Sequence, residues 1–189
     1  MKDEVLNSAD EQYLVKCCQN NSPSAQKVLY NMHVESMMIL CLRYIVNQED
    51  AREVLMDGFL NFFKHIKTFT YQGEGSVKAW LKKIVVNQCL MHLRKRQPFF
   101  IQAKEFEQYD TVGTDDDVLG HLSVKEIIKL VHSLPDGYRA VFNLYVFEGK
   151  NHREIGELLA ISENTSKSQL HRARTMLREK LLQEAKINY

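Results

Sequence analysis

The sequence is poor in the residues that make tight turns. It contains 8 Gly and 3 Pro in 189 residues, about half the usual share of these two residues together. β-Sandwiches and β-barrels need many tight turns, so this scarcity argues against both and predicts an all-α fold. Hydrophobic residues make up 44% of the chain, which is enough to build a core and excludes global disorder.

Long apolar runs and paired cysteines are missing too. The longest run of apolar side chains is 37–42, far short of the ~20 residues that a membrane span needs. The first residues are acidic, unlike the basic-then-apolar start of a signal peptide. None of the four cysteines stands at C-x-x-C spacing. We therefore expect a cytoplasmic protein with reduced thiols and no direct membrane insertion.

The common motifs of enzymes are absent as well. The sequence has no glycine-rich phosphate-binding loop, no H-E-x-x-H zinc motif and no G-x-S-x-G nucleophile motif. Its seven histidines are scattered, and none sits at metal-ligand spacing with a cysteine. We predict no catalytic residues, no metal site and no cofactor.

The charge is present, but it is segregated along the chain. The net charge is only +1, yet residues 76–96 carry six cations and no acid, while residues 97–124 carry one cation and six acids. A basic surface attracts phosphate backbones, although solvated helix faces are the alternative. The pattern predicts two small helical domains, at 1–97 and 124–189, joined by an acidic flexible linker at 98–123.

The N-terminal half has the apolar spacing of helices. A short helix is expected near 10–19, closed off by Pro23, with longer helices from 25 to 47 and from 49 onward. Glycines predict a loop at 69–76, and Ser76 is expected to cap a helix ending near 96. The expected apolar positions of the two longer helices are Val28, Met32, Ile39, Leu42 and Val46, and then Ala51, Val54, Leu55, Gly58 and Phe62.

The C-terminal half is also helical and ends in a helix-turn-helix pattern. Helices are expected around 127–134 and 136–147. Asn151 and Glu154 then resemble a capping box that opens a short helix, and Ser162 follows a tight turn as a cap for a long final helix. Such a pair of helices places its second member in a DNA major groove. An amphipathic helical hairpin with a basic exterior is the alternative.

Two helix faces carry the candidate binding residues. In the final helix, Leu170, Ala173, Leu177 and Leu181 form the expected buried stripe. The adjoining stripe is cationic and comprises Lys167, His171, Arg174 and Arg178. In the helix at 76–96, an aromatic, an amide and two cations share one face, as single-stranded nucleic acid requires; they are Trp80, Lys83, Asn87 and Arg94. A purely structural role for Trp80 in the core is the alternative.

The C-terminal half resembles region 4 of bacterial RNA polymerase sigma factors, most closely the extracytoplasmic-function group. The resemblance rests on Leu134-Pro135-Asp136-Gly137-Tyr138-Arg139, Glu154-Ile155-Gly156, Ile161 to Thr165 and Arg172-Ala173-Arg174. Region 4 binds the promoter −35 element in that family. The resemblance implies contacts to DNA from Lys167, Ser168, His171, Arg172 and Arg174. The family usually has an aliphatic residue where this chain has Ser166, whose buried hydroxyl needs a partner and is expected to bond to a carbonyl within its own helix.

The N-terminal half resembles region 2 of the same family. The run 47–63 looks like region 2.2, and the run from Phe69 through Gly73, Gly75 and Trp80 to Asn87 looks like regions 2.3 and 2.4. The resemblance implies −10 element recognition and melting, with a flipped base held near 69–76. The implied −10 contacts are Phe69, Tyr71, Ser76, Trp80, Lys83, Asn87 and Arg94. The implied polymerase contacts are Asp50, Arg52, Glu53, Met56, Asp57 and Phe59.

The resemblance also implies partners. They are core RNA polymerase, through its β′ clamp helices and β flap, promoter DNA and an anti-sigma factor. A two-domain helix-turn-helix regulator that acts without polymerase is the main alternative. An enzyme using a cysteine or histidine of the N-terminal half is a weaker alternative, because no base and orienting group stand at recognisable spacing.

Overall fold

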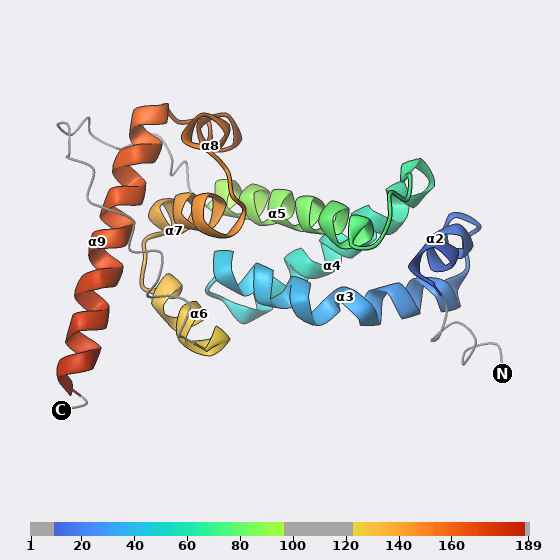
Figure 1. Ribbon diagram of the computed structural model, residues 1–189, viewed down its shortest axis with the longest axis horizontal. Helices are drawn as coiled ribbons and strands as arrows, with labels where there is room; N and C mark the ends of the chain where they lie inside the picture. Colours follow the sequence, from blue (N-terminus) through green and yellow to red (C-terminus); the bar gives the residue numbers. More distant parts are fainter. Residues whose placement is uncertain (1–9, 97–122, 188–189) are drawn as a thin grey trace. The chain divides into compact units, whose positions relative to one another are not determined.

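The chain is helical throughout the part that the structure describes. The structure, a computed structural model, describes residues 10–96 and 123–187 (Figure 1), and every regular element in those ranges is a helix. This confirms the predicted all-α fold. The chain divides into two compact units, Met1–His92 and Leu93–Tyr189. Almost all of the predicted linker at 98–123 lies outside the described residues, so the boundaries at 97 and 124 stay predictions.

In the described residues, the first unit contains three complete α-helices, a short 3₁₀ turn and most of a fourth α-helix, whose last residues fall in the second unit. Asparagine and serine caps begin two of the helices: the Ser22 hydroxyl accepts from the amide of Ala25, and the Asn47 side chain accepts from the amides of Glu49 and Asp50. The elements are α2 (Glu11–Gln19), α3 (Pro23–Tyr44), α4 (Gln48–His65), η1 (Ile66–Thr68) and α5 (Ser76–Arg96). Pro23 is the first residue of α3, where a missing N–H costs nothing, rather than the end of the helix before it.

The buried stripe of α3 differs from the predicted one. The structure buries Ala25, Leu29, His33, Met37, Leu40, Cys41 and Tyr44. Of the predicted positions, Met32 is 52% exposed and Val46, just beyond the helix, is 50% exposed. Apolar residues lie on more than one side of α3, so spacing alone does not determine which side faces the core. The prediction of the helix was confirmed, and the prediction of its buried side was wrong.

The core of α4 follows the predicted pattern closely. All five of its predicted positions are buried, and α5 buries Val77, Leu81 and Val85, while Ile84 is half-buried. Gly58 has a steric reason to be glycine, because a Cβ there would lie 2.8 Å from Cγ2 of Val85. The close approach of α4 and α5 holds the outer face of each helix in a fixed direction.

The second unit contains the helix-turn-helix. Its elements are α6 (Val124–His132), α7 (Asp136–Phe142), a π-helical turn η3 (Asn143–Phe147), α8 (His152–Leu159) and α9 (Glu163–Ile187). The predicted helix at 136–147 is therefore regular only in its first part and widens into the π turn. The core of this unit includes Leu130, Val131, Leu134, Leu144, Ile155, Leu159, Leu170 and Leu177. In the described ranges no helix combines the length and apolar character that a bilayer span requires.

Candidate nucleic-acid interfaces

The turn between α8 and α9 is fixed by local chemistry. Asn151 and Glu154 form the predicted capping box, with each side chain bonded to the other residue's backbone amide. A Cβ on Gly156 would lie 2.8 Å from the Ile161 carbonyl oxygen, so the turn has room only for glycine at this position. Ala160 takes the left-handed conformation, with φ of 55°. The Ser162 hydroxyl accepts from the Thr165 amide at 2.9 Å and caps α9, as predicted.

The buried hydroxyl of Ser166 has a different partner from the predicted one. Ser166 is 0% exposed, and its hydroxyl lies 2.9 Å from Nδ1 of His152 on α8. The prediction of a bond to a carbonyl of the same helix was therefore wrong. The His152 ring also stacks on Tyr145, with ring centroids 4.9 Å apart. A polar pair thus joins α8 to α9, and an aromatic stack joins α8 to η3.

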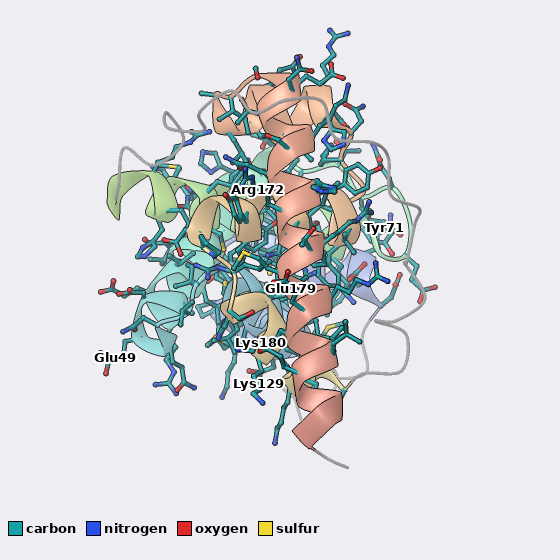
Figure 2. The ribbon with its side chains drawn as sticks, turned by 90° about the vertical axis from the view of Figure 1, so that its left-hand side faces the viewer. Glu49, Tyr71, Lys129, Arg172, Glu179 and Lys180 are labelled. Carbon is teal, nitrogen blue, oxygen red and sulfur yellow. The ribbon has the colours of Figure 1, made fainter. Side chains whose placement is uncertain are left out.

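The exposed side of α9 carries most of the predicted −35 residues. Lys167 is exposed and pairs with Glu163 at 2.7 Å, one turn earlier. Ser168, His171 and Arg172 are half-buried on the same helix, and Arg172 is labelled on α9 in Figure 2. Arg174 differs from these residues, because its guanidinium lies over the Tyr145 ring, 5.5 Å from the centroid. Arg174 is therefore partly engaged within its own unit.

The buried stripe of α9 agrees with the prediction except at its end. Leu170, Ala173 and Leu177 are buried, whereas Leu181 is half-buried. On the adjoining cationic stripe, Lys167 and Arg178 are exposed, whereas His171 and Arg174 are half-buried.

In the first unit the predicted −10 residues meet where the loop at 69–75 joins α5. The rings of Phe69 and Trp80 stack with centroids 4.8 Å apart and planes 15° apart. The ring of Phe62, on α4, also packs against Trp80, with ring centroids 5.0 Å apart. Trp80 and Phe69 are both half-buried. Trp80 thus lies partly in the core and partly at the surface, and its role in binding nucleic acid stays a prediction.

The remaining −10 residues are distributed along this surface. Lys83 and Asn87 are exposed on α5, as is Arg94 further along the helix, while Tyr71 is half-buried in the loop. Ser76 is the first helical residue of α5 and does not follow the predicted capping scheme. Its hydroxyl donates to the Gly73 carbonyl at 2.7 Å and accepts from the Gln72 amide at 3.3 Å, so it closes the loop.

Two residues of α2 reach this loop and were missed by sequence reasoning. The Gln19 side chain donates to the carbonyls of Ile66 and Phe69 at 3.2 and 2.9 Å. Glu11 lies with one carboxylate oxygen 3.4 Å from Nε2 of the buried His33. Burial raises the pKa of Glu11, and a hydrogen bond from the backbone of Gly75 opposes that rise. No local pattern marks these residues, because their partners lie far along the chain.

The outer face of α4 carries the predicted polymerase residues. Arg52, Glu53, Met56 and Asp57 are exposed, and Asp50 is half-buried with a carboxylate oxygen 3.7 Å from Nε2 of His92. Phe59 differs from the others, because it is only 2% exposed. Its ring packs on Tyr30, with ring centroids 4.6 Å apart, and a polymerase contact from Phe59 stays a prediction.

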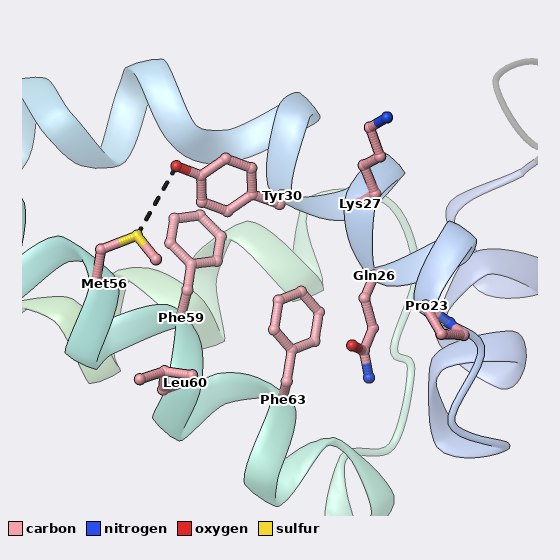
Figure 3. A pocket seen from close by; sticks show the side chains of 8 residues that line it. All are labelled: Pro23, Gln26, Lys27, Tyr30, Met56, Phe59, Leu60 and Phe63. Atoms are coloured by element: carbon pink, nitrogen blue, oxygen red, sulfur yellow. Dashed lines mark hydrogen bonds between the residues drawn. The ribbon is translucent and has the colours of Figure 1, made fainter.

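A groove lies between α3 and α4 beside these residues. Its volume is about 240 Å³, and Figure 3 shows its lining side chains. Phe59 and Phe63 line it from α4, and Tyr30 lines it from α3, while Leu60 beside them is 65% exposed. Phe59 therefore supports an apolar groove from beneath. Among the described residues, no group of three or more His, Cys, Asp or Glu is placed to hold a metal ion.

Comparison with known proteins agrees with this geometry. A model of sigma-70 region 2 matches residues 29–99, and a model of sigma-70 region 4 matches residues 124–177, so the two together cover more than half of the chain. One solved chain, from the structure of CnrH in complex with the cytosolic domain of CnrY, overlays with a TM-score of 0.49 at 18% identity, covering 90% of this chain and 96% of that one. That likeness is too weak to carry an argument.

Curated relatives match along most of the chain. An ECF RNA polymerase sigma-E factor of Haemophilus influenzae is 26% identical, over 90% of this chain and 95% of that protein. The ECF RNA polymerase sigma factor SigE of Mycolicibacterium smegmatis is 29% identical, over 81% of this chain and 60% of that protein. The RNA polymerase sigma factor SigV of Bacillus subtilis is 25% identical, over 80% and 88%. The chain belongs to the sigma-70 family of RNA polymerase sigma factors, in the extracytoplasmic-function group.

Proposed function

We propose that this sigma factor binds core RNA polymerase, recognises a promoter at its −35 and −10 elements and promotes opening of the strands. The observation that carries the proposal is that each family-matched segment presents exposed cationic and polar side chains on one helix, α5 in one and α9 in the other. The polymerase performs the chemistry, so we assign no catalytic residue to this chain. Its place of action is the cytoplasm, where polymerase and promoter DNA meet.

The −35 element is proposed to meet the N-terminal half of α9. Lys167, Ser168, His171 and Arg172 lie over its first turns, outside the stripe that faces the core. Side chains near the start of a recognition helix reach base edges, and cations further along it meet phosphates. Arg174, which packs over Tyr145, is proposed to reach phosphate from the edge of this surface.

The −10 element is proposed to meet the loop at 69–75 and the adjoining face of α5. The stacked rings of Phe69 and Trp80 offer an aromatic platform beside a base that has left the duplex. Tyr71 and Ser76 border this position, and Lys83, Asn87 and Arg94 continue it along α5. Unstacking a base costs a few kcal/mol, which contacts of this kind must return.

The polymerase is proposed to contact α4. Asp50, Arg52, Glu53, Met56 and Asp57 form a mixed charged and apolar face next to the groove floored by Phe59. Such a face fits the β′ clamp helices, since an exposed apolar groove with a charged rim suits a packed helix. By analogy with its family the second unit is proposed to meet the β flap, and an anti-sigma factor is proposed to cover these same faces.

The proposal is tested by separating duplex binding from opening. The template is the strongest promoter found by run-off transcription of genomic DNA with bacterial core polymerase. Lys167→Ala and Arg172→Ala should weaken closed-complex formation on that promoter, by about tenfold each for lost charge-assisted bonds. Trp80→Ala and Asn87→Ala should leave closed complexes intact and slow opening, as measured by 2-aminopurine fluorescence in the −10 element.

Lys125→Ala, which removes an exposed lysine from α6, is the matched control and should change neither step. Equal effects of all four variants on closed-complex formation would refute the division between the two surfaces. Failure of the wild-type chain to bind core polymerase would refute the proposed function itself and favour a regulator that acts alone.

A further inference from the structure

The loop at 69–75 has few contacts of its own that fix its conformation. Gly73 and Gly75 have φ of 109° and 81°, in the left-handed region that favours glycine, and a Cβ at either position would meet nothing within 4 Å. The bonds within the loop, from Ser76 to Gly73 and Gln72, close only its second half. A glycine-rich loop that must capture a base would lose conformational entropy on binding unless other contacts fix it first.

The C-terminal end of α2 holds the start of the loop. Gln19 is the last residue of α2, and its side-chain amide has two hydrogens to donate. It donates to the carbonyl of Ile66, in η1, and to the carbonyl of Phe69, the first residue after η1. The Phe69 ring is the one that stacks on Trp80. Gln19 therefore fixes the backbone that orients the aromatic stack.

Glu11, the first residue of α2, lies beside the end of the loop. The backbone of Gly75, directly before α5, acts on the Glu11 carboxylate and lowers its pKa against the effect of burial. The same carboxylate lies 3.4 Å from Nε2 of His33 on α3, and both side chains are largely buried, at 13% and 9% exposure. His33 thus limits the positions that Glu11 can take. The eight-residue separation of Glu11 and Gln19 on one helix corresponds to ~12 Å.

We propose that α2 is a clamp on the −10 recognition loop, in which Gln19 is the positioning residue that holds the start of the loop through its two hydrogen bonds, while Glu11 supports the end of the loop. The inference rests on the proposed function, since it concerns the loop to which −10 recognition is assigned. Neither residue needs to touch DNA. Their contacts hold the loop in the shape that receives an unpaired base before DNA arrives, which lowers the entropy lost on base capture.

The test compares three variants of α2 in the full chain. Gln19→Ala removes both hydrogen-bond donors, and Glu11→Ala removes the carboxylate beside Gly75 and His33. Glu11→Gln keeps an acceptor oxygen and should rescue most of the loss seen with Glu11→Ala. Gln12→Ala removes an exposed glutamine of the same helix and is the matched control.

The first readout needs neither polymerase nor DNA. Hydrogen exchange of the amides at 69–76 in the free chain should become about tenfold faster in Gln19→Ala and Glu11→Ala than in the wild type. It should be unchanged in Gln12→Ala and close to wild type in Glu11→Gln. Unchanged exchange in the first two variants would overturn the clamp, whatever the chain does with polymerase.

The second readout uses holoenzyme on the promoter described above. Both alanine variants should slow opening about tenfold, with closed-complex affinity unchanged, and should reduce the penalty for base substitutions in the −10 element. Equal loss of core binding, closed complexes and opening would mean a general structural role and would overturn the inference. If the wild-type chain opens promoters and the Gln19→Ala variant opens them equally fast, the clamp is overturned and the proposed function stands. A wild-type chain inactive with core polymerase overturns the proposed function and the clamp with it.

Discussion

The two recognition elements of this sigma factor are held in shape by different means. The turn before α9 is fixed by neighbours in the sequence: a capping box, a glycine that admits a close carbonyl, a serine cap and a His152–Ser166 pair only 14 residues apart. The loop before α5 is held by Gln19, whose partners lie 47 and 50 residues away. The proposed duplex-binding surface is thus encoded locally, whereas the proposed strand-opening surface would depend on a distant helix.

This difference makes the two surfaces sensitive to different substitutions. Changes within the turn should affect α8 and α9 and leave the loop at 69–75 alone. Changes in α2 should alter the loop without any change in the loop's own sequence.

The largest effect is expected from Gly156→Ala. Its Cβ would lie 2.8 Å from the Ile161 carbonyl oxygen, and backbone atoms cannot move away as a flexible side chain can. We expect a loss of about 2 kcal/mol in stability of the α8–α9 pair, together with weaker closed-complex formation. Hydrogen exchange of the α8 and α9 amides measures the first, and a −35 duplex competition assay measures the second.

Gly58→Ala is the mirror variant in the other unit, where a Cβ would meet Cγ2 of Val85 at 2.8 Å. It should speed exchange in α4 and α5 and leave α8 and α9 unchanged. If either glycine variant loosened both units equally, the separation between them would be wrong.

A smaller effect is expected at the buried polar pair. Ser166→Ala leaves the His152 ring nitrogen without its partner and should cost about 1–2 kcal/mol. Replacing both residues by apolar ones, His152→Leu with Ser166→Val, should recover most of the lost stability. A buried polar group without a partner costs more free energy than the removal of both polar groups. A double-mutant cycle from exchange of the α9 amides measures the coupling, and purely additive effects would contradict it.

The pH dependence of the second unit should be weaker still and of defined sign. Burial lowers the pKa of His152, with Lys167 and Arg174 acting in the same direction and Glu163 opposing them. Because the unfolded chain then takes up the proton first, the stability from neutral His152 is present above about pH 6.5 and is lost as the pH falls below it. His152→Gln should flatten this dependence in α8 and α9.

Exchange resolved by residue is required for that measurement. Burial also lowers the pKa of His33 in the first unit, with Lys78 acting in the same direction, so a signal averaged over the chain would mix the two histidines. A steady rise in α9 stability as the pH falls from 7 to 5.5 would contradict the assignment to His152.

The smallest effect is expected at Glu163. Its carboxylate holds Lys167 at 2.7 Å, with both side chains more than half exposed, so the pair contributes little stability. Lys167 must leave that pair to meet DNA, so Glu163→Gln should tighten duplex binding about twofold at low salt. Fluorescence anisotropy at two salt concentrations measures this, with Glu157→Gln on α8 as the control. A weaker complex would mean that Lys167 does not meet DNA.

The local encoding of the turn explains which features the sequence predicted well. Asn151 with Glu154, and Ser162 three residues before Thr165, are readable patterns because cap and partner lie within one helical turn. The buried positions of α4 were readable for the same reason, since one side of that helix is clearly apolar. The side of α3 that faces the core was not, because α3 is apolar on more than one side.

The features that escaped prediction depend on distance along the chain. The partner of Ser166 is a histidine of the preceding helix, and nothing in the local sequence favours it over a carbonyl. Phe59 looks like its neighbours in the sequence, yet it is buried against Tyr30. Glu11 and Gln19 show no motif, because their role arises only when α2 packs beside the loop.

The central claim is that one chain uses two separately held surfaces to direct polymerase to promoters. Transcription of genomic DNA by core polymerase with and without this chain, with start sites mapped and permanganate footprints taken at each, tests it most directly. The account predicts transcripts that depend on the chain, each starting downstream of two shared sequence elements, with unpaired thymines confined to the region around the −10 element and the start. Transcripts that do not depend on the chain, or starts that share only one element, would contradict it.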